Sequence, residues 1–116
     1  MVTYLAMISG RLASPIALEE LGEFSDVLIH RIGEKIHGPA NAGNYETDFL
    51  QVGHASLDAI LDLLDKIVID NTCVIDEIII HIVNIYTSQC NMEIDRKKLK
   101  RIAGLNATLT ISCDEE

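Results

Sequence analysis

Four histidines and three cysteines are the side chains most able to supply catalytic or metal-binding chemistry in this 116-residue sequence. Metal centres take three or four such ligands, and some of these are usually closely spaced along the chain. No short ligand spacing joins the histidines, which are His30, His37, His54 and His81. A metal site would have to be assembled from distant parts of the chain, and we predict none.

A cysteine and a histidine can also form a nucleophile and its general base. Cys73 and His81 would be the candidates, but nothing in their spacing recommends the pair, and His81 lies in a stretch that predicts a β-strand. We therefore interpret His81 as a hydrogen-bonded sheet residue, and a chemical role is the lesser alternative. The sequence has no phosphate-binding loop, nucleophile elbow or calcium loop. It predicts a protein that is not an enzyme and has no cofactor.

The three cysteines are odd in number and widely spaced, at positions 73, 90 and 113. This pattern fits neither a disulfide framework nor a zinc knuckle, so we expect reduced thiols. The first ten residues have no positively charged segment, and the longest apolar stretch, 74–86, is too short to span a bilayer. The length suits a single domain over residues 1–116. We expect this domain to be cytoplasmic.

Charge is divided unevenly along the chain. Five of the nine Lys and Arg residues lie between 96 and 101, whereas the chain has 18 Asp and Glu residues and a net charge of −9. Binding to nucleic acid or to an anionic membrane requires Lys and Arg to neutralise phosphates, so neither is the expected partner. The expected partner is a protein with a basic surface.

An acidic stripe accompanies the clearest helix of the sequence. Ser56 can cap this helix, and apolar residues recur over 57–68 at the spacing of one helical face, with three aspartates gathered away from it. A solvated outer face is the simpler explanation, and a docking surface for a basic partner is the sharper one. We predict partner-binding residues on this stripe and on the acidic stretch that precedes it: Asp58, Asp62, Asp65, Glu19, Glu20 and Glu23.

The basic segment predicts a second well-marked helix. Asp95 can cap it, Ile94 and Leu99 have the spacing of a hydrophobic staple, and Gly104 suits a left-handed ending. Leu99 and Ile102 are expected to hold one face to the core, and no aromatic residue is interleaved for base stacking. We therefore interpret this helix as mainly architectural, with solvated charges, rather than as a nucleic-acid site.

The remaining patterns predict an α+β protein. Strands are expected at 4–9, 27–32, 46–52, 73–86 and 107–113, and a first helix at 15–21 begins with Pro15. The stretch 33–44 predicts a turn-rich loop. The order is β-α-β-β-α-β-α-β, which matches a split βαβ, ferredoxin-like sheet with its helices on one face. The long strand at 73–86 is apolar on both faces, which favours a central position.

With these elements placed, the chain resembles a bacterial family of small α+β domains of unknown function. The resemblance rests on Ser9-Gly10 after the first strand, Pro15 and Leu21-Gly22, the turn Gly33-Glu34-Lys35, and the ending Gly104 to Cys113. It covers nearly the whole length, but these motifs are caps and core positions. The family often has a tryptophan in its middle strand, where this chain has only Tyr45 or Phe49 nearby.

Small acidic proteins of this kind resemble the immunity proteins of toxin–immunity pairs, as in contact-dependent growth inhibition. The resemblance implies a cytoplasmic immunity protein that neutralises a cognate toxin domain, such as a basic nuclease, without catalysis. An alternative is a small-ligand regulatory module that dimerises through its sheet, like ACT domains. The motivation for the alternative is the long strand, whose second apolar face could form a homodimer contact.

Overall fold

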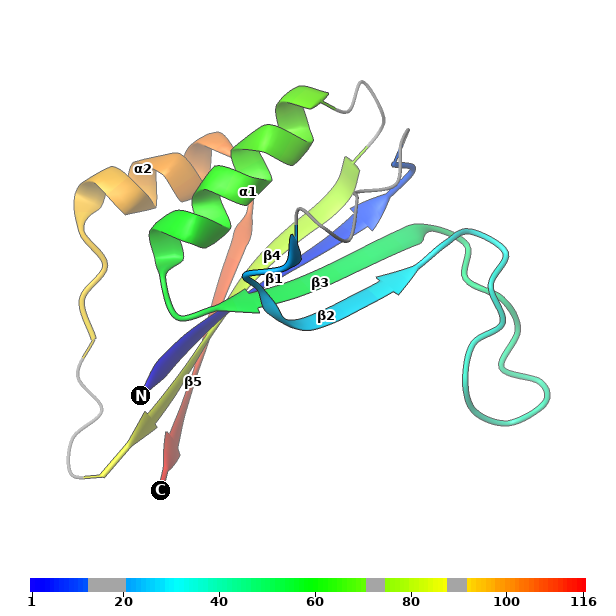
Figure 1. The fold of residues 1–116 in the computed structure, drawn as a ribbon, viewed down its shortest axis with the longest axis horizontal. Coiled ribbons are helices and arrows are strands. Elements are labelled where there is room, and N and C mark those ends of the chain that lie inside the picture. The colour runs from blue at the N-terminus through cyan, green and yellow to red at the C-terminus, as the bar shows by residue number, and fades with distance from the viewer. Residues whose placement is uncertain (13–20, 71–74, 88–91) are drawn as a thin grey trace.

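The structure is a computed structural model that describes residues 1–12, 21–70, 75–87 and 92–116. Five strands and two helices lie in these residues (Figure 1), and the fold is α+β, as the sequence predicted. The elements are β1 (Val2–Gly10), β2 (Ser25–His30), β3 (Asp48–His54), α1 (Leu57–Asp70), β4 (Ile75–Tyr86), α2 (Arg96–Gly104) and β5 (Thr108–Glu115).

The five strands form one mixed sheet in the order β2-β3-β1-β4-β5. Neighbouring strands are antiparallel except for β5, which runs parallel to β4 at the edge. The long strand β4 is therefore internal, as its apolar sequence predicted. It also follows that β3 and β4, which α1 connects, are parallel to one another on either side of β1.

The order of the described elements is β-β-β-α-β-α-β, whereas the predicted order was β-α-β-β-α-β-α-β. The two orders differ only in the helix that was predicted between β1 and β2. The helix expected at 15–21 falls almost wholly outside the described residues, and its last residue, Leu21, is buried in the core.

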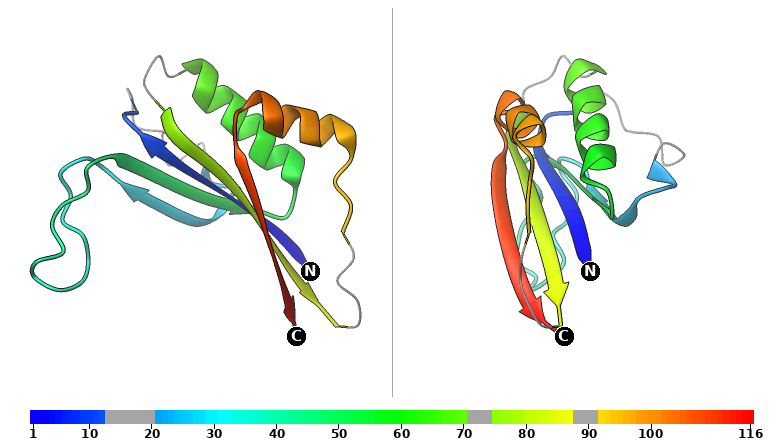
Figure 2. Two further views of the ribbon diagram at one scale, coloured as in Figure 1. Left: turned by 180° about the vertical axis from the view of Figure 1, so that it is seen from behind. Right: turned by 90° about the vertical axis from the view of Figure 1, so that its left-hand side faces the viewer.

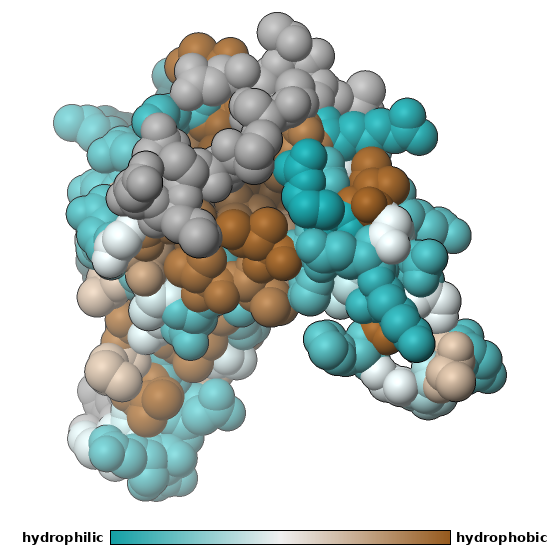
Figure 3. All heavy atoms as spheres, turned by 45° about the vertical axis from the view of Figure 1, so that its right-hand side comes forward, coloured by the Kyte–Doolittle hydropathy of each residue, from teal (hydrophilic) through white to brown (hydrophobic). Residues whose placement is uncertain are grey.

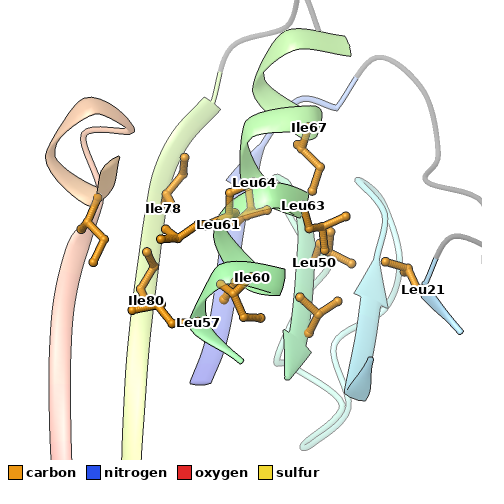
Figure 4. Packing of buried hydrophobic residues seen from close by; sticks show 14 residues of the cluster. Leu21, Leu50, Leu57, Ile60, Leu61, Leu63, Leu64, Ile67, Ile78 and Ile80 are labelled. Carbon is orange, nitrogen blue, oxygen red and sulfur yellow. The ribbon is translucent and has the colours of Figure 1, made fainter. Parts of the chain in front are cut away.

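The hydrophobic core lies between one face of the sheet and the two helices, which are neighbours in Figure 2. Even-numbered residues of the central strands, including Ala6, Val52 and Ile80, point to this face and are fully buried. Figure 4 shows the side chains of α1 directed toward the strands, where Leu50, Ile78 and Ile80 are labelled. From α1 the core takes Leu57, Ile60, Leu61, Leu63, Leu64 and Ile67, and from α2 it takes Ile102. Both helices therefore cover the same face.

The capping residues predicted for α1 and α2 are largely confirmed. The Ser56 hydroxyl accepts from the amide of Ala59 at 3.3 Å, and Asp95 accepts from the amide of Lys98 at 3.0 Å. The left-handed residue that ends α2 is Asn106, at φ 54°, and the prediction of Gly104 was wrong. Asn tolerates this conformation because its short side chain can hydrogen-bond locally.

Leu99 does not hold α2 to the core as expected, since it is 43% exposed. Ile102, which was expected to do the same, is buried. The two residues are three positions apart and so lie on the same side of the helix, but only Ile102 reaches the core. Leu99 therefore lies at the border of the buried face, with part of its side chain in solvent.

The opposite face of the sheet points away from α1 and α2, and we call it the open face. Along each strand, the side chains of the open face alternate with those that point into the core. The register places Met7 between Gln51 and Ile79, and Leu5 beside His81. The apolar residues of the open face are Leu5, Met7, Leu28, Phe49, Ile79, Val83 and Ile85. The long strand β4 thus has apolar residues on both faces, although within the described residues helices pack on only one of them.

Residues 31–47 form an arm that projects from the end of β2 and β3 (Figure 1). In Figure 3 the arm is a separate and mostly hydrophilic lobe. Its two sides are joined by backbone hydrogen bonds from Gly33 to Tyr45 at 2.9 Å and from Ile36 to Gly43 at 3.0 Å. Tyr45 stacks on His30 with 4.3 Å between the ring centroids, which fixes the base of the arm to the sheet.

Candidate functional site

The acidic stripe of α1 and the basic segment of α2 contact each other. The Arg101 guanidinium lies 2.7 Å from the Asp65 carboxylate and 2.9 Å from the Asp62 carboxylate. Asp58 is more distant, at 3.8 Å from Arg101 and 3.7 Å from the Lys98 ammonium. The acidic stripe and the basic segment, which are far apart in the sequence, therefore partly neutralise each other's charge in the fold.

Arg101 is the centre of this cluster. Hydrogen bonds to Asp65 and then to Asp62 raise the pKa of its guanidinium above an already high ordinary value, so it remains charged. The carboxylates stay accessible, with side chains 45% exposed at Asp65, 74% at Asp62 and 60% at Asp58. A carboxylate can accept about four hydrogen bonds, so each aspartate can still accept from a partner.

A groove runs along the other side of the stripe, between α1 and the segment that leads into β2. Its volume is about 460 Å³. Glu23, Asp58 and Asp62 contribute carboxylates to its lining, and Phe24 and Leu63 contribute apolar surface. Its other lining residues are Ser56, Ala59 and Lys66. A mainly polar groove with three carboxylates and some apolar surface suits the charged head and aliphatic stem of a lysine or arginine from another protein.

The structure brings together three of the six residues predicted to bind a partner. Glu23, Asp58 and Asp62 line the groove, although Glu23 is 35 residues from Asp58 and 39 from Asp62 in the sequence. Asp65 lies outside the groove, beside Arg101, and lines a smaller hollow at the far end of α2. Glu19 and Glu20 lie outside the described residues. The role of all six in binding stays a prediction.

The local charge around the groove is smaller than the sequence suggested. The three aspartates of the stripe contribute −3, and Arg101 and Lys98 return +2. With Glu23 and Lys66 added, the groove and its surroundings sum to −1. Any steering of a basic partner therefore depends on the net charge of −9 of the whole chain as well as on the groove.

Asp48 is a buried acid, and nothing in the sequence predicted that it would be buried. Its side chain is only 5% exposed and accepts from the amides of Leu12 and Ile32, both at 2.9 Å. Arg31 lies 3.4 Å away. Asp48 thus joins the start of β3 to the chain beyond β1 and β2. We assign it a structural role because both of its oxygens are used by the protein itself.

His81 is a hydrogen-bonded sheet residue, as predicted. Its Nδ1 lies 2.6 Å from the hydroxyl of Thr110, and its Nε2 lies 3.3 Å from the hydroxyl of Ser112. Both partners come from β5, so the histidine joins the two parallel strands on the open face. Cys73, its proposed catalytic partner, lies outside the described residues.

The prediction of reduced thiols was wrong for Cys113, which is disulfide-bonded. The other two cysteines, Cys73 and Cys90, lie outside the described residues. Sequence spacing could not indicate this bond because a disulfide depends on the separation of two Cα atoms in the folded chain. Among the described residues, no group of three or more His, Cys, Asp or Glu could hold a metal ion.

The fold and the groove together define a small α+β protein with a carboxylate-lined surface beside its main helix. Comparison with models of protein families, with curated proteins and with solved structures gave no match. Within the part of the chain that is described, no helix has the length and apolar character needed to cross a membrane.

We expect the Arg101→Gln variant to lower the free energy of unfolding by up to about 1 kcal/mol, because partly exposed ion pairs contribute little individually. The loss should shrink in high salt, which screens the repulsion left among the three aspartates. Urea denaturation at low and high ionic strength measures both effects. The matched control is Arg96→Gln, in the exposed first turn of α2, where removing a positive charge is neutral or slightly favourable. Equal losses in the two variants would contradict the prediction.

Proposed function

We propose that this chain is an immunity protein that binds and neutralises a basic toxin domain, such as a nuclease, without catalysis of its own. The observation that supports this best is the groove, which Glu23, Asp58 and Asp62 line together with Phe24 and Leu63. Such a surface fits a partner that presents basic side chains. The pairing would be of the contact-dependent growth inhibition type that the sequence resembles.

The proposed binding combines long-range attraction with short-range contact. The net charge of −9 draws a basic domain toward the chain and raises the rate of association. A lysine or arginine of the toxin then enters the groove, where Phe24 can contact its stem and the lining carboxylates can accept its hydrogen bonds. A toxin held in this way would have part of its own basic surface covered.

We also propose that the sheet is of the split βαβ type. In support, β3 and β4 are parallel, are connected by α1, and have antiparallel β1 between them. A second crossover between β1 and β2 would complete this layout, and the residues concerned lie outside the described part of the chain.

A cytoplasmic location is part of the proposal, since an immunity protein protects the cell that makes it. The disulfide bond of Cys113 favours a more oxidising compartment, because the cytoplasm keeps most thiols reduced. The two arguments point in different directions, and the location remains a proposal.

The test is a double charge reversal in the groove, Glu23→Lys with Asp58→Lys. We choose these residues because Asp62 and Asp65 hold Arg101 at short distance and are left intact. An immunity gene is expected to adjoin the gene of its toxin, so the probe is the C-terminal domain of a large secreted protein sought in the neighbouring reading frame. Association is followed by stopped-flow or biolayer interferometry. We expect association to slow by about 10-fold or more, with loss of protection of the cell.

The control reverses the same number of charges away from the groove, with Asp76→Lys and Glu77→Lys at the exposed start of β4. This control should keep most of the association rate. Equal effects in the two double variants would show that only net charge matters, and full protection by the folded groove variant would refute the groove as the binding site.

The alternative function, a small-ligand regulatory module that dimerises through its sheet, has one observation in its favour. The sheet has an apolar open face. This observation supports dimerisation through the sheet, but it does not support binding of a small ligand.

A further inference from the structure

The open face has a row of apolar side chains across its middle. Met7 lies beside Ile79. One row further along, Leu5 lies beside His81, and Val83 lies one row beyond that, beside Thr3. Leu28, on the edge strand β2, extends the same surface and is 43% exposed. The others are partly exposed, although neighbouring strands shield their flanks. Large residues of this kind in the middle of a sheet normally pack on something.

The centre of the open face, at Met7 and Ile79, carries no charge. Around it lie neutral polar groups, such as Gln51 and Thr110, and the imidazole of His81. The acids on this face are Asp26, whose carboxylate lies beside Gly53 and close to Leu5, Glu77, one row from Ile79, and Asp114, near the end of β5. The Met7–Ile79 pair itself offers nothing to a basic partner, whereas two copies of the chain can bury this apolar pair against each other.

The dimensions of the sheet also suit self-association. Five strands at about 4.8 Å spacing and a length of about 3.3 Å for each residue give a face of roughly 20 by 30 Å, or about 600 Å² in projection. Side-chain relief adds to the accessible area, which brings it close to the roughly 800 Å² that each partner buries in a stable interface. Twisted sheets pack face to face with their strands rotated by about 30°.

We propose that two copies of this chain form a symmetric dimer through their open faces. The contact is the same surface on both copies, as twofold symmetry requires. Met7, Ile79 and Leu5 lie at its centre, Val83 lies two rows from Ile79, and the helices and the groove remain on the outside. The proposal does not depend on the toxin-binding function, since each copy keeps its groove free on the other side of the sheet.

A single substitution with a closely matched control tests this dimer. Ile79→Lys places a charge at the centre of the open face, whereas Ile69→Lys makes the same change at the end of α1, where Ile69 is 78% exposed. By analytical ultracentrifugation, the wild type and Ile69→Lys should sediment as dimers of the 12.8 kDa chain. We expect Ile79→Lys to weaken self-association by about 10-fold or more, since two lysines would lose hydration at the interface. Circular dichroism checks that both variants fold.

A second measurement uses only the wild type and does not depend on how a variant folds. Oxidation by peroxide reports access to methionine sulfur. Met7 should oxidise more slowly at high protein concentration than at low concentration, whereas Met1, which is 81% exposed, should not change. A monomer at all concentrations, with Met7 oxidised equally fast throughout, would overturn the proposal. A dimer that survives Ile79→Lys and leaves Met7 unprotected would also overturn it, because the two chains would then meet elsewhere.

Discussion

Replacing Asp48 with asparagine is expected to lower the free energy of unfolding by about 2 to 3 kcal/mol. The carboxylate accepts from the buried amide of Leu12 and from the partly buried amide of Ile32, one at each oxygen. An asparagine can accept only one of these bonds, and its NH₂ group then faces the other amide as a second donor. The loss is measurable by urea or thermal denaturation.

The same variant should alter the pH dependence of stability. Burial raises the pKa of Asp48, but hydrogen bonds from Ile32 and Leu12 and the charge of Arg31 outweigh it, so the pKa lies below its ordinary value. Such a group stabilises the fold above its unfolded pKa, and the contribution is lost as the pH falls through the lower, folded value. The difference in stability between wild type and variant should be constant above about pH 5 and shrink below about pH 4.

The control for both measurements is Asp76→Asn, the same change at an exposed position. It should leave the free energy of unfolding nearly unchanged. An Asp48→Asn protein as stable as this control at pH 7 would show that the two amides find other acceptors.

Replacing Leu64 with alanine is expected to cost about 3 to 5 kcal/mol of stability, the largest effect of any substitution considered for this chain. Leu64 is fully buried in α1 and packs in the cluster between this helix and the sheet (Figure 4). Truncation removes its transfer free energy and leaves a cavity that the fixed strands can close only in part. Chemical denaturation measures the change, with the slope against denaturant concentration checking that the unfolding remains two-state.

Leu99→Ala on α2 provides the matched control, because the wild-type side chain is 43% exposed. We expect it to lower stability by less than about 1 kcal/mol. A comparable loss in the two variants would mean that Leu99 is buried in solution, as the hydrophobic staple predicted from the sequence would require.

The proposed groove and the proposed dimer use opposite sides of the sheet, which makes them separable. Glu23 and Asp58 lie on the helical side, whereas Ile79 lies on the open face. The Ile79→Lys variant should therefore still bind the toxin domain, and the groove variant should still dimerise. Failure of one proposal leaves the other standing.

The sequence by itself determined the local elements of this protein. Helical periodicity predicted most of the residues of α1 that reach the core, although it included Val68, which is 41% exposed, and missed Leu63, which is buried. Ser56 and Asp95 were correctly expected to cap their helices. The apolar character of β4 predicted its internal position. These features depend on residues a few positions apart, whose geometry is fixed by the repeat of the helix or strand itself.

Only the tertiary structure decided how distant segments meet. Arg101 is 39 residues from Asp62, and no local pattern showed that the basic segment would neutralise the acidic stripe. The burial of Asp48 also depends on contacts with residues 16 and 36 positions away. Which face of the sheet stays open was likewise decided by where α1 and α2 pack. The physical reason is common to all three cases: charge pairing and burial depend on distances in the folded chain, which the local spacing of residue types does not specify.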